Sequence, residues 1–183
     1  MSKVASTANT MGVDIDQLNA QIATVVATTR QAPESVGTAF KTIYTRMNDI
    51  KTGAEDAEVS LGKYSGIMAS LGFNVLDTTG HLRDTGLVME EIGGRWQDLT
   101  REQQIYLAQT MGGQRQVNQL MALFDNWTTY SELLNTSLES EGTLAEKNAR
   151  YMESLGAKME QLGAAGERVK DALINENELK GGV

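Results

Sequence analysis

Two adjacent glycines, Gly112 and Gly113, stand before an arginine in the stretch GGQRQVNQL, residues 112–120. Glycine-rich turns bind phosphate when a buried strand precedes them, a Lys-Ser or Lys-Thr pair follows them and a metal-binding acid lies downstream. Here the preceding LAQTM is helical in character and the glycines are followed by Gln-Arg-Gln. The pattern instead predicts that one helix ends at the glycines and another begins after them.

The sequence holds one histidine, His81, and no cysteine. A metal cluster of histidines cannot form within such a chain, and a Ser-His-Asp relay would have to be built around His81 alone. His81 lies in TTGHLRD, which we expect to be a solvent-facing turn. The carboxylates of Glu90 and Glu91 lack EF-hand or paired-acid spacing and are typical of a solvated helix face. We therefore predict no catalysis, no cofactor and no metal ion.

The charge and hydropathy of the chain exclude several classes of function. A formal net charge of −8 repels a phosphate backbone, and no stripe of Lys and Arg offsets it, so we expect no direct nucleic-acid binding. No apolar run reaches the roughly 18 residues of a membrane span, and the N-terminus lacks the apolar core of a signal peptide. The absence of cysteine favours a cytosolic compartment. A polar, helix-compatible start and the ending KGGV suggest a fragment of a longer protein.

The periodicity of the apolar residues predicts an all-α fold of amphipathic helices and helical hairpins. One proline in 183 residues is typical of long helices. Apolar residues recur at intervals of three and four in 15–25, 36–50, 61–71 and 87–96. Glycine pairs at 93–94, 112–113 and 181–182 are interpreted as joints between helices.

Local start signals mark several of these helices. Asp14 is placed to cap the first, Pro33 suits the first turn of the second, and Thr100 with Gln103 forms a capping-box pattern. The segment FNVLDTTGHLRD, residues 73–84, predicts a turn or tiny hairpin.

A heptad pattern of mostly apolar residues can be followed over the last third of the chain. It runs through Val117, Leu120, Phe124, Trp127, Ser131, Leu134, Leu138, Glu141, Ala145, Asn148, Met152, Leu155, Met159, Leu162, Gly166, Val169 and Leu173. Glu141 and Gly142 interrupt it, and a capping box of Thr143 and Glu146 follows. We predict one helix from residue 117 to about 142 and a second over about 143–178.

The second of these helices resembles half a coiled coil. We therefore expect two parts, a helical core over residues 1–140 and a long C-terminal helix with a frayed tail over 141–183. The helices at 36–50 and 143–178 are candidates for contact with partners. The candidate interface, called the C-terminal seam below, consists of Met152, Leu155, Met159, Leu162, Val169 and Leu173.

Three segments, residues 12–47, 71–127 and 141–162, resemble the core region of tail tape measure proteins from long-tailed bacteriophages and related prophages. The most specific parts are TRQ followed by VGTAFK, the GHLRD turn and the GGQRQ joint, in that order. The resemblance implies a structural protein that lies extended in the tail tube in a few copies, sets tail length, scaffolds tube assembly and is later ejected to help DNA delivery.

The resemblance also implies partners and a location. The partners are further copies of the chain and tail tube or tail-tip proteins, and the location is the lumen of the virion tail, with the host cytoplasm during assembly. The chain lacks the membrane segments and long repetitive coiled coil of full family members, so we interpret it as a core region from a longer protein.

Two alternatives remain open. A cytosolic helical adaptor or export substrate would also act by helix–helix association, and GGRWQDL superficially suggests small secreted helical hairpins. The length of the chain and its five or more expected helices argue against this class. A wall-degrading enzyme is a weaker alternative because the chain has one histidine and no cysteine.

Overall fold

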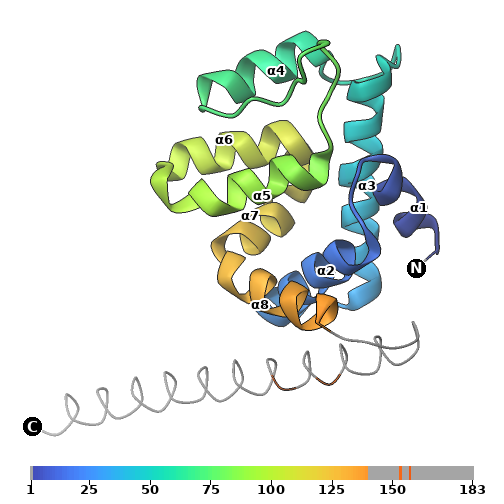
Figure 1. The fold of residues 1–183 in the computed structure, drawn as a ribbon, viewed down its shortest axis with the longest axis vertical. Helices are drawn as coiled ribbons and strands as arrows, with labels where there is room; N and C mark the ends of the chain where they lie inside the picture. Colours follow the sequence, from blue (N-terminus) through green and yellow to red (C-terminus); the bar gives the residue numbers. More distant parts are fainter. Residues whose placement is uncertain (1, 140–152, 154–156, 158–183) are drawn as a thin grey trace, which may run out of the picture. The chain divides into compact units, whose positions relative to one another are not determined.

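The structure, a computed structural model, describes residues 2–139, 153 and 157. Its helices are α1 (Ser2–Thr10), α2 (Ile15–Thr29), α3 (Pro33–Thr52), α4 (Leu61–Ser70), α5 (Thr85–Arg95), α6 (Arg101–Gly112), α7 (Val117–Asp125) and α8 (Trp127–Leu138), with 3₁₀ turns at Trp96–Asp98 and Gln114–Gln116 (Figure 1). The described residues contain helices and no strand, which confirms the predicted all-α fold. The chain divides into two compact units, residues 1–134 and 135–183. We call residues 2–134 the helical body.

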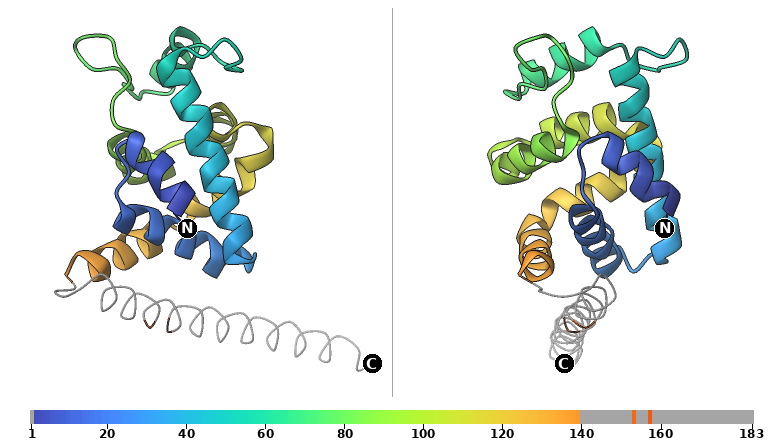
Figure 2. Two further views of the ribbon diagram at one scale, coloured as in Figure 1. Left: turned by 90° about the vertical axis from the view of Figure 1, so that its right-hand side faces the viewer. Right: turned by 45° about the vertical axis from the view of Figure 1, so that its right-hand side comes forward.

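Helix α3 forms the centre of the helical body. It contacts α1, α2, α4 and α6, and both views of Figure 2 show α1 lying beside it. The side chains of its apolar stripe, among them Phe40, Ile43 and Met47, are buried. The helix expected at 36–50 is therefore present, but its apolar face is covered by the chain's own helices. Contact of this helix with partners stays a prediction, and its buried apolar stripe would take no part in it.

The predicted start signals of α2, α3 and α6 are all present. Asp14 Oδ1 accepts from the amide of Gln17 at 2.8 Å, and Gln17 Oε1 accepts from the amide of Asp14 at 3.1 Å. Thr100 and Gln103 form the same reciprocal pair at 3.3 and 2.9 Å. Pro33 occupies the first turn of α3, where its missing N–H leaves no bond unmade. These local signals fix where the helices begin.

A tiny hairpin joins α4 to α5, as the sequence predicts. Leu76 and Leu82 form an isolated antiparallel bridge. The amide of Asp77 donates to the carbonyl of His81 at 2.8 Å, and the amide of Arg83 donates to the carbonyl of Val75 at 2.9 Å. Leu82 and Val75 are buried, so the base of the hairpin is fixed by packing while its tip is exposed.

The helix predicted from residue 117 to about 142 is broken at Asn126. This residue has φ −116° and ψ 37°, outside the helical range, and separates α7 from α8. Its side-chain Nδ2 donates to the carbonyl of Ala122 at 2.8 Å, while its backbone amide donates to the carbonyl of Leu123 at 3.2 Å. The side chain thus takes the acceptor that the backbone amide would use in a continuous helix, which is a known way for Asn to compete with helical bonding.

Candidate functional site

The glycine pair at 112–113 is a joint between helices and not a phosphate loop. α6 ends at Gly112, and Gly113 follows with φ +72°, a value that favours glycine. Its amide donates to the carbonyl of Gln109 at 2.9 Å. The nearest cation, Arg46, lies against Gly113 but already forms an ion pair with Glu58. The prediction of a helix end is confirmed.

His81 belongs to a hydrogen-bonded turn at the exposed tip of the hairpin. Asp77 Oδ1 accepts from the amide and the hydroxyl of Thr79 at 2.8 and 2.7 Å and from the amide of His81 at 3.0 Å. These bonds lower the pKa of the Asp77 carboxyl, the largest cause being the Thr79 hydroxyl. Thr79 Oγ1 also lies 2.7 Å from His81 Nδ1. A hydroxyl, an imidazole and a carboxylate therefore lie close together. Which of the other two groups the carboxylate binds decides whether the three can catalyse a reaction.

Catalysis by such a group requires the carboxylate to hold one nitrogen of the imidazole while the other nitrogen faces the hydroxyl. Here the carboxylate of Asp77 binds the hydroxyl and two backbone amides, and it does not orient the imidazole. All three residues are exposed to solvent. The arrangement stabilises a turn, in agreement with the sequence prediction for His81. Among the residues that the structure describes, no group of three His, Cys, Asp or Glu side chains could hold a metal ion.

A buried polar cluster lies where α2, α3 and α5 meet. The hydroxyl of Tyr44 donates to Gln21 Oε1 and lies 3.5 Å from Met89 Sδ. Gln21 Nε2 is 3.9 Å from the same sulfur. Tyr44 is fully buried and Gln21 is 1% exposed, and burial raises the pKa of the Tyr44 hydroxyl far above its ordinary value. The hydroxyl stays protonated and serves as a fixed donor that ties α3 to α2.

Helix α8 is seated on α5 beside this cluster. The ring of Trp127 covers Gly93 so closely that a Cβ there would lie 2.0 Å from a ring atom. The hydroxyl of Tyr130 donates to Glu90 Oε1 at 2.7 Å, and Gln17 Nε2 approaches the same oxygen at 3.4 Å. Burial and this bond raise the pKa of the Tyr130 hydroxyl well above its ordinary value. We call the contacts of Trp127 with Gly93 and of Tyr130 with Glu90 the α8 seat.

Aromatic rings packed against one another continue the α8 seat into the helical body. Trp96 and Phe124 have ring centroids 4.8 Å apart, Phe124 and Trp127 are 5.6 Å apart, and Trp127 and Tyr130 are 4.2 Å apart. These spacings lie in or near the favourable range for aromatic pairs. The aromatic residues of this region are therefore packing residues.

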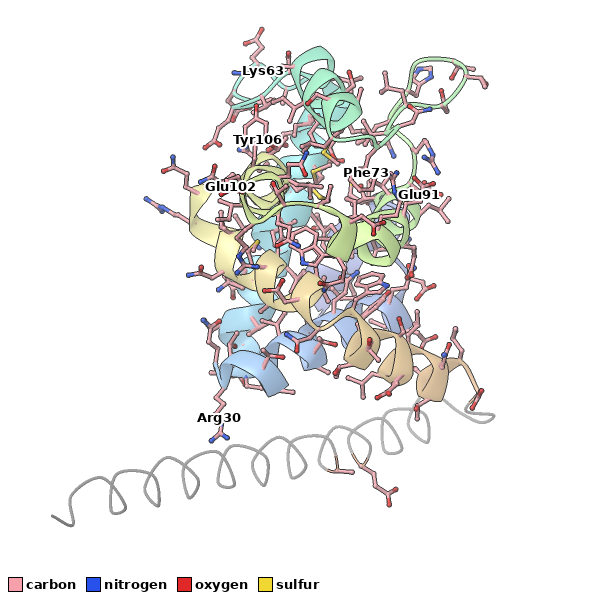
Figure 3. The ribbon with its side chains drawn as sticks, turned by 90° about the vertical axis from the view of Figure 1, so that its left-hand side faces the viewer. Arg30, Lys63, Phe73, Glu91, Glu102 and Tyr106 are labelled. Carbon is pink, nitrogen blue, oxygen red and sulfur yellow. The ribbon has the colours of Figure 1, made fainter. Side chains whose placement is uncertain are left out.

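Two arginines hold the hairpin against α5. Arg83 pairs with Glu91 at 2.5 Å, and this pair lowers the pKa of the Glu91 carboxyl. The guanidinium of Arg95 donates to the carbonyl of Gly72 at 2.9 Å and lies over the ring of Phe73, 4.8 Å from its centroid. Figure 3 labels Phe73 and Glu91 on this side of the helical body. Both arginines therefore bind nearby acids and carbonyls.

Sequence reasoning missed the role of Gly93. It interpreted the pair at 93–94 as a joint, but both glycines lie within the last turn of α5. Gly93 is required there because the ring of Trp127 occupies the space of its Cβ, while Gly94 has nothing within 4 Å of its Cβ position. A glycine inside a helical pattern next to a tryptophan-bearing segment is the signal that could have indicated a close helix contact.

The large apolar side chains that the helical body exposes are distributed over three helices. They are Ile15 on α2, Leu87 on α5, and Ile105 and Tyr106 on α6. Figure 3 shows Tyr106 at the outer surface together with Glu102 of the same helix and Lys63 of α4. Singly exposed apolar side chains are ordinary for a folded protein. The residues of the C-terminal seam, from Met152 to Leu173, lie outside the described residues.

Comparison with known families identifies the family of this chain. A family model described as phage-related minor tail protein matches residues 1–113, which is more than half of the chain and extends from α1 to the joint after α6. The chain belongs to the phage-related minor tail protein family. Membership indicates a structural role in the virion tail and contact with other tail components. No solved structure matches the chain.

A membrane-spanning role depends on the length and hydropathy of the helices. In the part of the chain that the structure describes, no helix combines the length and hydropathy needed to cross a membrane. Family membership favours the tail role over the adaptor and export alternatives and over a wall-degrading enzyme.

Proposed function

We propose that the chain is the core region of a tail tape measure protein. In this role it lies within the tail tube, sets tail length, scaffolds the assembly of tube subunits and is ejected when DNA is delivered. The match to the phage-related minor tail family over residues 1–113 carries the proposal. The resemblance of residues 71–127 and 141–162 to tape measure cores extends that support beyond the matched region.

The two parts of the chain have different tasks in this proposal. Residues 1–140 form a helical core whose buried polar cluster and α8 seat give it a defined shape. Residues 141–183 form a long helix that pairs with further copies through the C-terminal seam. Acting by packing and association, such a protein needs no cofactor and no catalytic residue. The assembly partners are tail tube or tail-tip proteins, met in the host cytoplasm before the chain is enclosed in the tail.

Tail length is the quantity that tests this function. An insertion of about 35 residues that continues the heptad pattern between residues 162 and 163, made in the complete gene, adds about 52 Å of helix at 1.5 Å per residue. We expect virion tails to lengthen by roughly that amount in electron micrographs. The length distribution should remain narrow, because every tail would contain the same longer helix.

A matched insertion separates length measurement from damage to the protein. The same number of Gly and Ser residues inserted after Thr79, in the exposed tip of the hairpin, adds a surface loop and no helical length. We expect these tails to keep their original length. Tails of unchanged length with the helical insertion, or equal lengthening with both insertions, would contradict the tape measure function.

A further inference from the structure

The only local cause found for the break between α7 and α8 is the bond from the Asn126 side chain to the carbonyl of Ala122. Glycine and proline cause most sharp helix breaks, and neither occurs between Val117 and Leu138. A single residue, Asn126, leaves the helical conformation, and its carbonyl already accepts the first bond of α8 from Tyr130 at 3.1 Å. Asn has only a modest helix penalty, so residues 117–138 can form one helix.

Tertiary contacts hold the break. The ring of Trp127 sits on Gly93, and the Tyr130 hydroxyl donates to Glu90 at 2.7 Å. Leu133, one turn further, is buried with 2% exposure. These side chains occupy one face of α8, and they can reach their positions only if the chain bends at Asn126.

A second row of α8 residues lies next to this face and shares Trp127 with it. Ser131 and Leu134 follow Trp127 in this row and continue the heptad positions of Leu120 and Phe124, which are buried in α7. In the bent chain Ser131 and Leu134 are only half-buried. The sequence therefore specifies a heptad row whose part beyond Trp127 is not fully covered in the bent chain.

We propose that Asn126 is a hinge at which α8 leaves the α8 seat and joins α7 in one continuous helix. The bent form is closed by the contacts with Gly93 and Glu90. Straightening exchanges these contacts for the helical bonds that the break interrupts and aligns the heptad stripe of α7 with that of α8. The inference concerns the chain itself and does not depend on the tape measure function.

A distance measurement between α5 and α8 tests the hinge in the full chain. The sequence has no cysteine, so two can be introduced for spin labels without background. Gly94→Cys has open space at its Cβ, and Glu132→Cys is at an exposed position of α8. We expect one short distance in this labelled parent protein. Adding Gly93→Ala, whose Cβ would collide with Trp127, should create a second, longer distance.

Substitutions at the hinge distinguish straightening from simple loosening. In the Gly93→Ala background, Asn126→Ala removes the side-chain bond to Ala122 and favours a continuous helix, whereas Asn126→Gly disfavours it. We expect the ratio of long to short distances to be about fivefold higher with Ala than with Gly, from their difference in helix propensity. If Gly93→Ala does not fold, Tyr130→Phe, which loses the bond to Glu90, replaces it as the releasing change.

Two results would overturn the hinge. One is a single short distance in every folded releasing variant, which would mean that α8 does not leave its seat. The other is a long distance whose population is the same for Ala and Gly at residue 126, which would mean that α8 separates from α5 without joining α7.

Discussion

At the scale of single residues, two buried tyrosines with different surroundings allow a matched test. The hydroxyl of Tyr44 donates to Gln21, whereas the hydroxyl of Tyr64 is buried without a hydrogen-bond partner. Tyr44→Phe leaves a buried amide oxygen unpaired, and we expect a loss of about 1–3 kcal/mol in the free energy of unfolding. Tyr64→Phe removes an unpaired polar group and should be neutral or stabilising. Urea unfolding of both variants measures the difference, and equal losses would contradict this account.

The same tyrosines limit the stability of the folded chain at high pH. Burial raises the pKa of both hydroxyls far above the ordinary tyrosine value near 10. Above that pH the unfolded chain loses the protons while the folded chain keeps them, so the unfolded state binds fewer protons and stability falls as pH rises. The contribution is fully present below pH 10. When urea unfolding is repeated at a series of pH values, the free energy of unfolding of both Phe variants should therefore decline less steeply above about pH 10 than that of the parent protein.

At the scale of elements, adjacent glycines test how closely α5 and α8 approach. Gly93→Ala places a methyl group inside the ring of Trp127, and we expect a loss of about 1–3 kcal/mol in stability from overpacking. Gly94→Ala meets open space in the same turn and should stabilise α5 by up to about 1 kcal/mol. Thermal unfolding of the two variants compares them directly. A loss of similar size at both positions would show that helix backbone effects, and not the contact with Trp127, decide the outcome.

The elements also show what the sequence can predict. The starts of α2, α3 and α6 depend on residues three positions apart or on a proline, so Asp14, Pro33 and Thr100 could be assigned from local patterns. The break at Asn126 could not, because it depends on contacts with Gly93 and Glu90, more than thirty residues away in the sequence.

The buried polar cluster was beyond sequence reasoning for the same reason. Tyr44 and Gln21 are 23 positions apart on different helices, and nothing in either local pattern indicates the other. Periodicity places both helices correctly, but the pairing of polar side chains requires the relative rotation of the helices. Packing fixes that rotation, and a heptad or 3.6-residue period leaves it open.

At the scale of the whole molecule, the net charge of −8 opposes self-association, so copies can gather only through a sufficiently apolar surface. The helical body distributes its exposed large apolar side chains over three helices, which leaves the C-terminal seam as the proposed contact between copies. The heptad pattern predicts that Leu155 and Leu162 face the proposed partner helix, and that Ala157 and Ala164, also seven residues apart, lie on the opposite side.

This pattern supplies a charge-matched pair of variants for the last prediction. Leu155→Glu with Leu162→Glu places charges inside the proposed seam, where desolvation without a partner is costly, and should reduce the particle to the 19.9 kDa monomer. Ala157→Glu with Ala164→Glu adds the same charge on the solvent side and should keep the mass of the parent protein, a multiple of 19.9 kDa. Light scattering coupled to size exclusion measures both masses. A monomeric parent protein, or the same mass in both variants, would show that copies do not associate through the seam. The tape measure function would then rest on the family match and on the response of tail length to the helical insertion.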